Sequence, residues 1–256
     1  MKAIFFDVDG TLLCRDGTIR EQTIHSLQQL KENNCLLFLA TGRHTTELTH
    51  LLEIITIPFD GYVTLNGQLC LDSSFHIIKE EPISASDKDV LITFAGKNAF
   101  PIVIIEKDRL YINCIDEKVR FAQKAIHMPL PPIEAYHGDA IYQFTAFLDT
   151  VQTALLTKLL THCKITRWNP YGIDIISNTG GKAKGIAAML EHFHILKEDT
   201  ISFGDGENDR DMLSYTQIGI AMQNADPALL QIADYITESA ENDGITKALK
   251  HFHLIK

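Results

Sequence analysis

The sequence has no long hydrophobic run, and its longest uninterrupted apolar stretch, residues 35–40, is far shorter than a membrane span. An aspartate at position 7 also leaves no room for the apolar region of a signal peptide. Basic residues are in the minority, because 23 Lys and Arg against 33 Asp and Glu give a formal net charge of −10. These absences predict a cytoplasmic protein without a membrane segment and without a broad face for nucleic acid.

Paired cysteines and several catalytic signatures are missing as well. The five cysteines lie far apart, form no CxxC pair and are odd in number, which favours reduced thiols over a disulfide framework. There is no GxSxG elbow, and Ala183 stands where a P-loop would need Ser or Thr after Gly181-Lys182. The third glycine of a dinucleotide-binding GxGxxG falls on Asp209, so that signal is weak.

What the chain does have is an alternation of strand-like and helix-like stretches. Apolar runs at 4–6, 36–40 and 61–65 predict buried strands, and a helix is predicted over 45–55. The spacing of Thr18 and Glu21 predicts a capping box at the start of the helix that precedes the second strand. Because a strand, a helix and a strand in succession form a βαβ unit, these strands should be parallel.

From about residue 82 the sequence pattern changes to alternating or β-branched runs, which are separated by helical stretches and prolines. The strand and helix alternation resumes after Gly180-Gly181. We therefore predict a doubly wound, Rossmann-like α/β core made of residues 1–81 and 179–256, with an inserted α+β domain at 82–178. The strands predicted in the insert cover residues 102–105, 110–115, 141–147, 165–168 and 174–177.

Carboxylates follow two of the predicted core strands directly. Asp7 and Asp9 come after the first strand, and Asp205 and Asp209 follow a later one. Ligands bind at the carboxyl ends of the strands in an open parallel sheet. Because side chains alternate along a strand, Asp7 and Asp9 should point the same way while Val8 points into the core. Two carboxylates that close require a cation, another positive group or a shared proton, so the pair is a cation site, an acid/base pair, or both.

The spacing of these acids excludes an EF-hand loop, because the required glycine falls on Leu12 or Arg210 and the required glutamate on Thr18 or Thr216. The structural alternative is a set of solvated turn aspartates, since Asp-Gly is a common turn dipeptide. A hard cation such as Mg²⁺ fits better, because it binds one or two carboxylates, keeps waters and leaves room for a substrate phosphate.

Two further segments could bind phosphate. Thr41 and Gly42 follow the second predicted strand, and a threonine hydroxyl and a glycine N–H can bind phosphate oxygens or simply cap a helix. Lys182, after two glycines, is either a solvated residue at a helix start or a counter-charge for a phosphoryl group.

Taken together, four segments resemble the motifs of the haloacid dehalogenase (HAD) superfamily, in the expected order and across nearly the whole chain. They are Asp7-Val8-Asp9-Gly10-Thr11, Thr41-Gly42-Arg43, Lys182, and Gly204-Asp205-Gly206-Glu207-Asn208-Asp209. The long insert, with Asn66-Gly67, Asn224-Ala225 and Asp243-Gly244, is similar to the Cof-like branch of that superfamily. The insert of that branch is a cap that covers the active site and selects the substrate.

The resemblance implies a role for each matching residue. Asp7 would be the nucleophile that forms an aspartyl-phosphate, and Asp9 would be the general acid and base. Asp7, Asp205 and the backbone carbonyl of Asp9 would hold Mg²⁺, with Asp209 supporting the metal. The phosphoryl group would be bound by Thr41, Gly42, Lys182 and Asn208, and Lys184 is an alternative to Lys182.

The expected function is that of a Mg²⁺-dependent phosphatase acting on a small phosphorylated metabolite, such as a sugar phosphate. A carboxylate nucleophile splits one hard hydrolysis into two easier steps, and Mg²⁺ with a lysine stabilises the transferred charge. The alternatives are a phosphomutase that uses the same residues and a phosphometabolite-binding regulatory protein without turnover. The sequence does not specify the oligomeric state or the substrate-facing residues of the insert.

Overall fold

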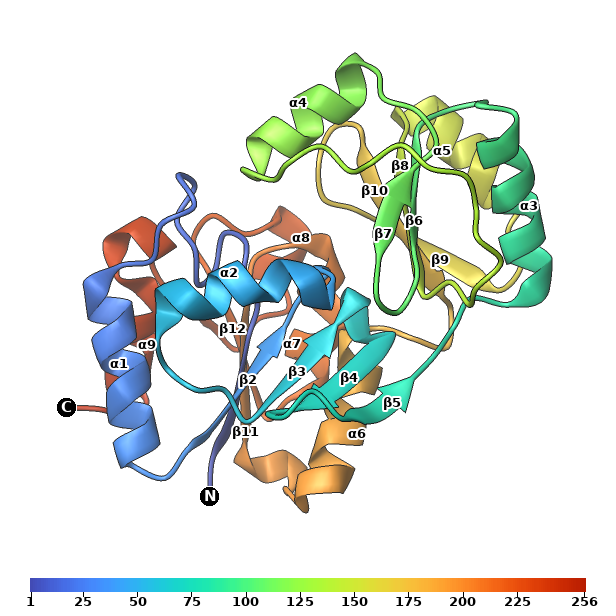
Figure 1. The fold of residues 1–256 in the computed structure, drawn as a ribbon. Coiled ribbons are helices and arrows are strands. Elements are labelled where there is room, and N and C mark those ends of the chain that lie inside the picture. Colours follow the sequence, from blue (N-terminus) through green and yellow to red (C-terminus); the bar gives the residue numbers. More distant parts are fainter. The chain divides into compact units, whose positions relative to one another are not determined.

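The computed structural model describes residues 1–256 apart from the side chain of His50. The chain forms two compact units, of which the first joins Met1–Lys79 to Lys182–Lys256 and the second is Glu80–Gly181. The predicted class is confirmed, because the first unit has a largely parallel sheet and the second has an antiparallel sheet with its own helices (Figure 1). None of the helices in the described part of the chain combines the length and apolarity needed to span a bilayer.

The first unit is built on eight strands in the order β13-β12-β11-β1-β2-β3-β4-β5. The strands from β13 to β3 pair in parallel, and β4 runs antiparallel to β3. Parallel strands covered on both faces read as continuous apolar runs, as β1 and β2 do. The strands are β1 (Ala3–Phe6), β2 (Leu36–Ala40), β3 (Gly61–Thr64), β4 (Leu69–Asp72), β5 (Ile77–Glu80), β11 (Thr200–Gly204), β12 (Ile218–Ala221) and β13 (Tyr235–Ile236).

Helices cover both faces of this sheet. On one face, Phe5 and Phe38 stack with ring centroids 4.7 Å apart and pack in a cluster with Ile186 and Met189 of α6. On the other, α1 and α9 lie side by side (Figure 1), joined by a 2.7 Å hydrogen bond between the hydroxyls of Ser26 and Thr246. The helices are α1 (Glu21–Glu32), α2 (Thr45–Ile55), α6 (Lys182–Phe193), α7 (Arg210–Tyr215), α8 (Pro227–Leu230) and α9 (Gly244–His251).

Two local features of this unit differ from the prediction. The capping box at Thr18 is wrong, because α1 begins at Glu21 with Arg20 at its N-cap, and no side chain caps it. Thr18 instead donates its N–H and its hydroxyl to Asp16, at 3.0 and 2.6 Å, across a turn in which Gly17 has a φ of 80°. Thr18 therefore bonds within its own turn and does not cap the helix. Strands β4 and β5 lie in a stretch for which the sequence predicts no element.

The second unit has five antiparallel strands in the order β7-β6-β8-β10-β9. One face of this sheet packs in a cluster that includes Ile104, Phe144 and Ile175 together with Leu91 of α3 and Leu156 of α5. The elements are α3 (Ala85–Gly96), β6 (Ile102–Ile105), β7 (Leu110–Ile112), α4 (Glu117–Ala125), β8 (Gln143–Phe147), α5 (Thr150–Thr157), β9 (Cys163–Arg167) and β10 (Gly172–Ser177).

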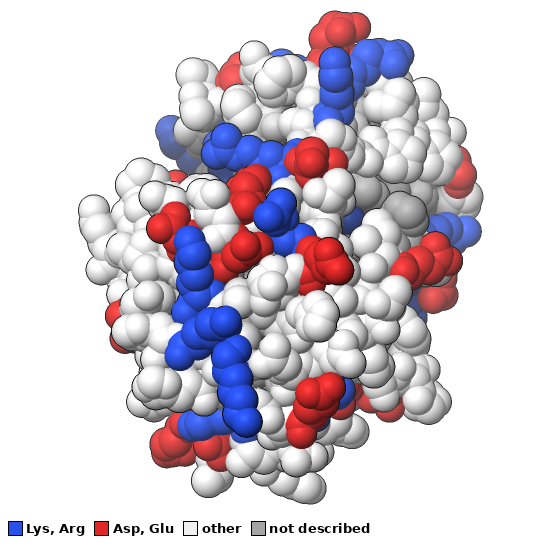
Figure 2. Space-filling model, turned by 90° about the vertical axis from the view of Figure 1, so that its left-hand side faces the viewer, with Lys and Arg blue, Asp and Glu red and all other residues white. Residues whose placement is uncertain are grey.

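Surface charge of both signs is interspersed on the face of the molecule drawn in Figure 2. Asp and Glu side chains lie among Lys and Arg side chains near the centre of the view, and several Lys and Arg side chains adjoin one another at its lower left. A nucleic-acid backbone is bound by a field of one sign. The face drawn here carries side chains of both signs.

A buried carboxylate joins α3 to the start of β9 in the second unit. Asp87, only 1% exposed, accepts the backbone N–H of His162 at 2.7 Å and the backbone N–H and hydroxyl of Thr161. Burial alone would raise the pKa of Asp87, but the backbone donors of His162 and Thr161 outweigh it and lower the pKa. The charged side chain of Asp87 therefore connects α3 to the start of β9, which are distant in sequence.

We predict that Asp87→Asn lowers the free energy of unfolding of the second unit by about 2–4 kcal/mol, because an amide leaves buried donors poorly satisfied. Trp168, the single tryptophan of the chain, lies in this unit, so its fluorescence during urea unfolding measures the effect. Asp89→Asn, at an exposed position of the same helix, is the matched control. Equal midpoints for the two variants would contradict the assignment.

The same interaction has a pH dependence. Since the folded state lowers the pKa of Asp87, its contribution is present above the unfolded value, about 3.9, and disappears as the pH falls through the folded value. The wild type should therefore lose more stability than Asp87→Asn between pH 7 and pH 3.

Candidate active site

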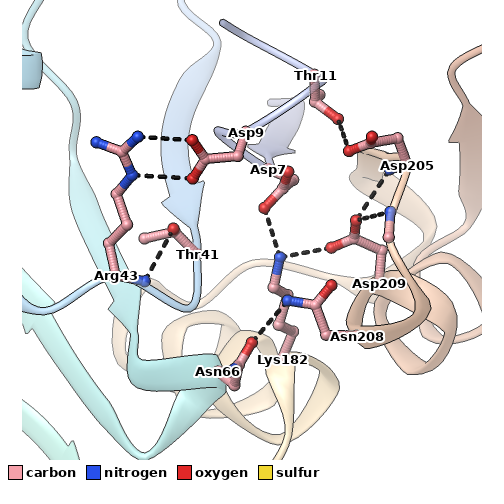
Figure 3. Close-up of polar contacts among 11 residues, drawn as sticks. Asp7, Asp9, Thr11, Thr41, Arg43, Asn66, Lys182, Asp205, Asn208 and Asp209 are labelled. Atoms are coloured by element: carbon pink, nitrogen blue, oxygen red, sulfur yellow. Dashed lines mark hydrogen bonds and ion pairs between the residues drawn. The ribbon is translucent and has the colours of Figure 1, made fainter. Parts of the chain in front are cut away.

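Four loops at the carboxyl ends of parallel strands form the site, and two of them, after β1 and β11, carry its acidic residues (Figure 3). Asp7 follows β1, Thr41 follows β2, Asp205 follows β11 and Asn224 follows β12. The backbone N–H of Asp7 still bonds to the carbonyl of Phe203, at 3.0 Å, which continues the pairing of β1 with β11 beyond the last strand residue. The sheet register therefore sets Asp7 beside the loop that carries Asp205.

Lys182, the first residue of α6, lies at the centre of this group. Its ammonium donates to Asp7 Oδ1 at 2.6 Å and to Asp209 Oδ1 at 2.5 Å, and its side chain is 0% exposed. The charges of Asp209 and Asp7 outweigh the cost of burial and raise the pKa of Lys182. Lys184, the alternative left open by the sequence, is exposed on the same helix. The structure thus places Lys182, and not Lys184, with the carboxylates.

Asp205 is oriented by residues from two other loops. Its Oδ1 accepts the hydroxyl of Thr11 at 3.1 Å, and its Oδ2 accepts the amide of Asn224 at 2.9 Å. Gly10 makes room for this carboxylate, because a Cβ at that position would lie 2.2 Å from Asp205 Oδ2. Gly10 also has a φ of 83°, which is strained for other residues.

Asp209 holds the loop that follows β11. Its Oδ2 accepts the backbone N–H groups of Asp205 and Gly206, both at 2.9 Å, while its Oδ1 accepts Lys182. The residue is completely buried. A Cβ at Gly204 would lie 2.6 Å from the Asp209 side chain, so a larger residue there would displace it. Asp209 thereby connects Lys182 to the backbone of Asp205.

Three carboxylates and one ammonium leave an excess of negative charge. Carboxylate oxygens of Asp7, Asp205 and Asp209 lie within 4.8 Å of one another. The pKa of Asp7 is raised to about 7, chiefly by burial and further by Asp209, although Lys182 opposes the shift. Burial, then Asp7 and Asp209, raise the pKa of Asp205 well above its ordinary value. An all-oxygen donor set with excess negative charge fits a hard divalent cation, so this group could hold a metal.

Asp9 turns away from this cluster. Its two oxygens accept Arg43 Nη2 at 2.6 Å and Nε at 2.9 Å, and its side chain is 43% exposed (Figure 3). The alternation of side chains along a strand predicted that Asp7 and Asp9 share one environment. The structure differs, because the two carboxylates have different surroundings. The strand ends at Phe6, and the N–H of Leu13 bonds back to the carbonyl of Val8 at 2.8 Å in a tight turn. Val8 is buried, as predicted.

The remaining predicted residues lie along the side of the site formed by the loops after β2 and β11. Thr41 is 1% exposed, and its hydroxyl accepts the N–H of Arg43 at 3.1 Å, with Gly42 between them. Asn208 lies in the loop after β11, and its amide donates to Asn66 Oδ1 at 2.8 Å. The positions of Thr41, Gly42, Lys182 and Asn208 around Asp7 are compatible with phosphoryl binding.

Four residues contribute to the site without a role predicted from the sequence. The sequence analysis quotes all four within segments of the family resemblance, Thr11 and Arg43 in two of the four motifs and Asn66 and Asn224 in pairs typical of the Cof-like branch. The available signal was the same for all four, namely a polar residue in the loop that follows a strand, two to five positions after the last strand residue. That signal locates a residue at the sheet edge but does not tell which side chain it contacts.

Comparison with known proteins decides the family. The family model of haloacid dehalogenase-like hydrolases matches residues 4–249. The chain belongs to the haloacid dehalogenase-like hydrolases. The family expected from the four motifs is therefore confirmed, and the protein is a hydrolase of the phosphatase type.

Several related proteins match over at least 96% of their lengths. The 5-amino-6-(5-phospho-D-ribitylamino)uracil phosphatase YitU of Bacillus subtilis is 26% identical, over 97% of this chain and 96% of its own. Among solved structures, the HAD subclass IIB sugar phosphatase BT4131 is 31% identical with a TM-score of 0.91, covering 100% of both chains. BT1666 of Bacteroides thetaiotaomicron, a phosphatase of the same superfamily, is 27% identical with a TM-score of 0.89, covering 100% of this chain and 96% of its own.

We predict that Asp209→Asn lowers the free energy of unfolding by about 2–4 kcal/mol, because an amide cannot accept from Lys182 and from two backbone N–H groups at once. Urea unfolding followed by far-UV circular dichroism measures the change. Glu32→Gln, at the exposed end of α1, should stay within about 0.5 kcal/mol of the wild type. An Asp209→Asn variant as stable as this control would show that the bonds to the loop contribute little.

Proposed function

We propose that this protein is a Mg²⁺-dependent phosphatase that hydrolyses small phosphorylated metabolites through an aspartyl-phosphate on Asp7. The observation that carries the proposal is the arrangement of Asp7, whose Oδ1 is held by the buried Lys182 within a group of carboxylates. Bound there by Asp7, Asp205 and the carbonyl of Asp9, with Asp209 in support, Mg²⁺ would neutralise the excess negative charge and draw phosphoryl oxygens toward the nucleophile.

The chain's own residues would perform two successive displacements. In the first, a carboxylate oxygen of Asp7 attacks phosphorus and the bond from phosphorus to the ester oxygen breaks. Asp9 gives its proton to the leaving oxygen, which departs as an alcohol. In the second, Asp9 takes a proton from water, whose oxygen attacks phosphorus and releases inorganic phosphate from Asp7. Asp9 ends in its protonated form, so the cycle consumes one water for each ester.

Arg43 sets a condition on this cycle. Both oxygens of Asp9 are bound to the guanidinium, so neither is available to a leaving group in this conformation. Asp9 would have to leave Arg43, or turn within the pair, before it could protonate the ester oxygen. Thr41, Gly42, Lys182 and Asn208 would meanwhile bind the non-reacting phosphoryl oxygens.

We further propose that the second unit is a cap that selects the substrate, as expected for residues 82–178. The relatives YitU and BT4131 carry the names of a ribitylaminouracil phosphate phosphatase and a sugar phosphatase. Sugar phosphates and ribityl phosphates are therefore the first classes to test. A panel of such esters ranked by kcat/KM would identify the preferred class.

We predict that the wild type releases inorganic phosphate only with Mg²⁺ and that EDTA stops the release. Asp7→Asn should lower kcat at least 10³-fold while remaining folded, because an amide is no nucleophile. Phosphate release with added Mg²⁺ or EDTA and circular dichroism are the measurements. Undiminished turnover by Asp7→Asn would refute the mechanism. Phosphate returned to another position of the substrate, instead of released, would identify the phosphomutase alternative. No turnover on any ester would favour the regulatory binding protein.

Asp9→Asn completes this experiment. Its defect should be large for alkyl esters and shrink for p-nitrophenyl phosphate, whose leaving group departs without a proton. An equal loss on both kinds of ester would argue against general acid catalysis.

A further inference from the structure

A short turn between β3 and β4 has an unusual backbone. The 3₁₀ turn Leu65–Gly67 places three consecutive residues in the left-handed region, with φ values of 50°, 54° and 86°. Leu65 and Asn66 are not glycines, and each such residue costs about 1–2 kcal/mol. All three residues are buried, so the surrounding structure must hold the turn in place.

The turn contacts the loop after β2 through its backbone. The N–H of Asn66 donates to the carbonyl of Thr41 at 2.9 Å, and the N–H of Leu65 donates to the carbonyl of Arg43 at 3.2 Å. These bonds brace both sides of Gly42. The left-handed conformation directs two successive N–H groups at one loop, which an extended strand cannot do because its N–H groups alternate in direction.

The turn also contacts the helix that begins with Lys182. A Cβ on Gly185, one turn into α6, would lie 3.1 Å from Gly67 Cα and 2.4 Å from Val63. The helix can approach the turn this closely because residue 185 is glycine. The start of α6 is therefore packed directly on the turn.

The Asn66 side chain reaches the third segment of the site. Its Oδ1 accepts Asn208 Nδ2 at 2.8 Å (Figure 3), and Asn66 is 1% exposed. An amide nitrogen has two N–H groups. With one of them bound to Asn66, the amide of Asn208 is held in the orientation that keeps its second N–H for another acceptor. A phosphoryl oxygen is an acceptor, so the opposite orientation of the amide would present it with the wrong group.

We propose that Asn66 is a positioning residue of the phosphoryl site, which orients the amide of Asn208 and fixes the loop of Thr41 to the same turn. This inference rests on the proposed function, since it concerns the binding of a phosphoryl group. The strained turn is thereby explained as the element that aligns three separate segments of the chain.

Asn66→Gly tests the proposal, because glycine accepts the left-handed backbone and removes only the side chain. We expect inorganic phosphate to inhibit this variant about tenfold more weakly and kcat/KM to fall by a similar factor. Asn34→Gly is the matched control: Asn34 also has a left-handed φ, of 58°, but is exposed at the opposite end of the sheet, before β2. It should leave kcat/KM and phosphate inhibition unchanged.

A double-mutant cycle separates positioning from a general structural effect. If Asn66 acts through Asn208, then Asn66→Gly should change phosphate inhibition less than twofold in an Asn208→Ala background. The full tenfold effect in that background, or an Asn66→Gly variant equal to Asn34→Gly, would overturn the inference while the wild type still releases phosphate. A wild type that releases no phosphate from any ester would instead overturn the proposed function, and this role with it.

Discussion

The buried ammonium of Lys182 is the interaction on which the site depends. A lysine that is 0% exposed is stable only when its charge is matched, and here Asp7 and Asp209 match it. Those two carboxylates come from loops after β1 and β11, which are neighbours in the sheet, and the lysine comes from the first residue of α6. Removing Lys182 would leave the buried carboxylates without their ammonium partner, so the lysine holds the three elements together.

The same constraint explains the remaining electrostatics. One ammonium does not neutralise three nearby carboxylates, and burial together with the charge of Asp209 raises the pKa of Asp7 to about 7. A divalent cation would neutralise this excess negative charge, and it would also attract the phosphoryl group to the nucleophile. Asp9 has a cation of its own, because Arg43 is paired with it.

Much of this arrangement could be predicted from the sequence. Apolar runs that end in Asp7, Thr41 and Asp205 indicate parallel strands, and parallel strands bring their carboxyl ends to one edge. That reasoning gives the fold class, the sheet edge and most of the residues found there. It needs no knowledge of side-chain contacts, which is why it succeeds for whole elements.

Contacts between loops could not be predicted in the same way. The pairing of Asp9 with Arg43 depends on the turn after Phe6, where the alternation of a strand no longer applies. The bond from Asn208 to Asn66 joins residues 142 positions apart and depends on a left-handed turn whose leucine gives no signal of positive φ. At Thr18, a nearby acceptor, Asp16, replaced the predicted helix cap. In each case the contact was determined by the local backbone geometry, by a neighbouring residue or by a residue in a distant loop.

The central claim is that Asp7 becomes covalently phosphorylated. The most direct test is a rapid acid quench of the wild type during turnover of a good substrate with Mg²⁺, followed by mass spectrometry of the N-terminal peptide. The account predicts one additional phosphoryl group on Asp7 at early times, which disappears as substrate is exhausted. Phosphate release without any phosphoryl group on Asp7, or with one on another residue, would contradict it.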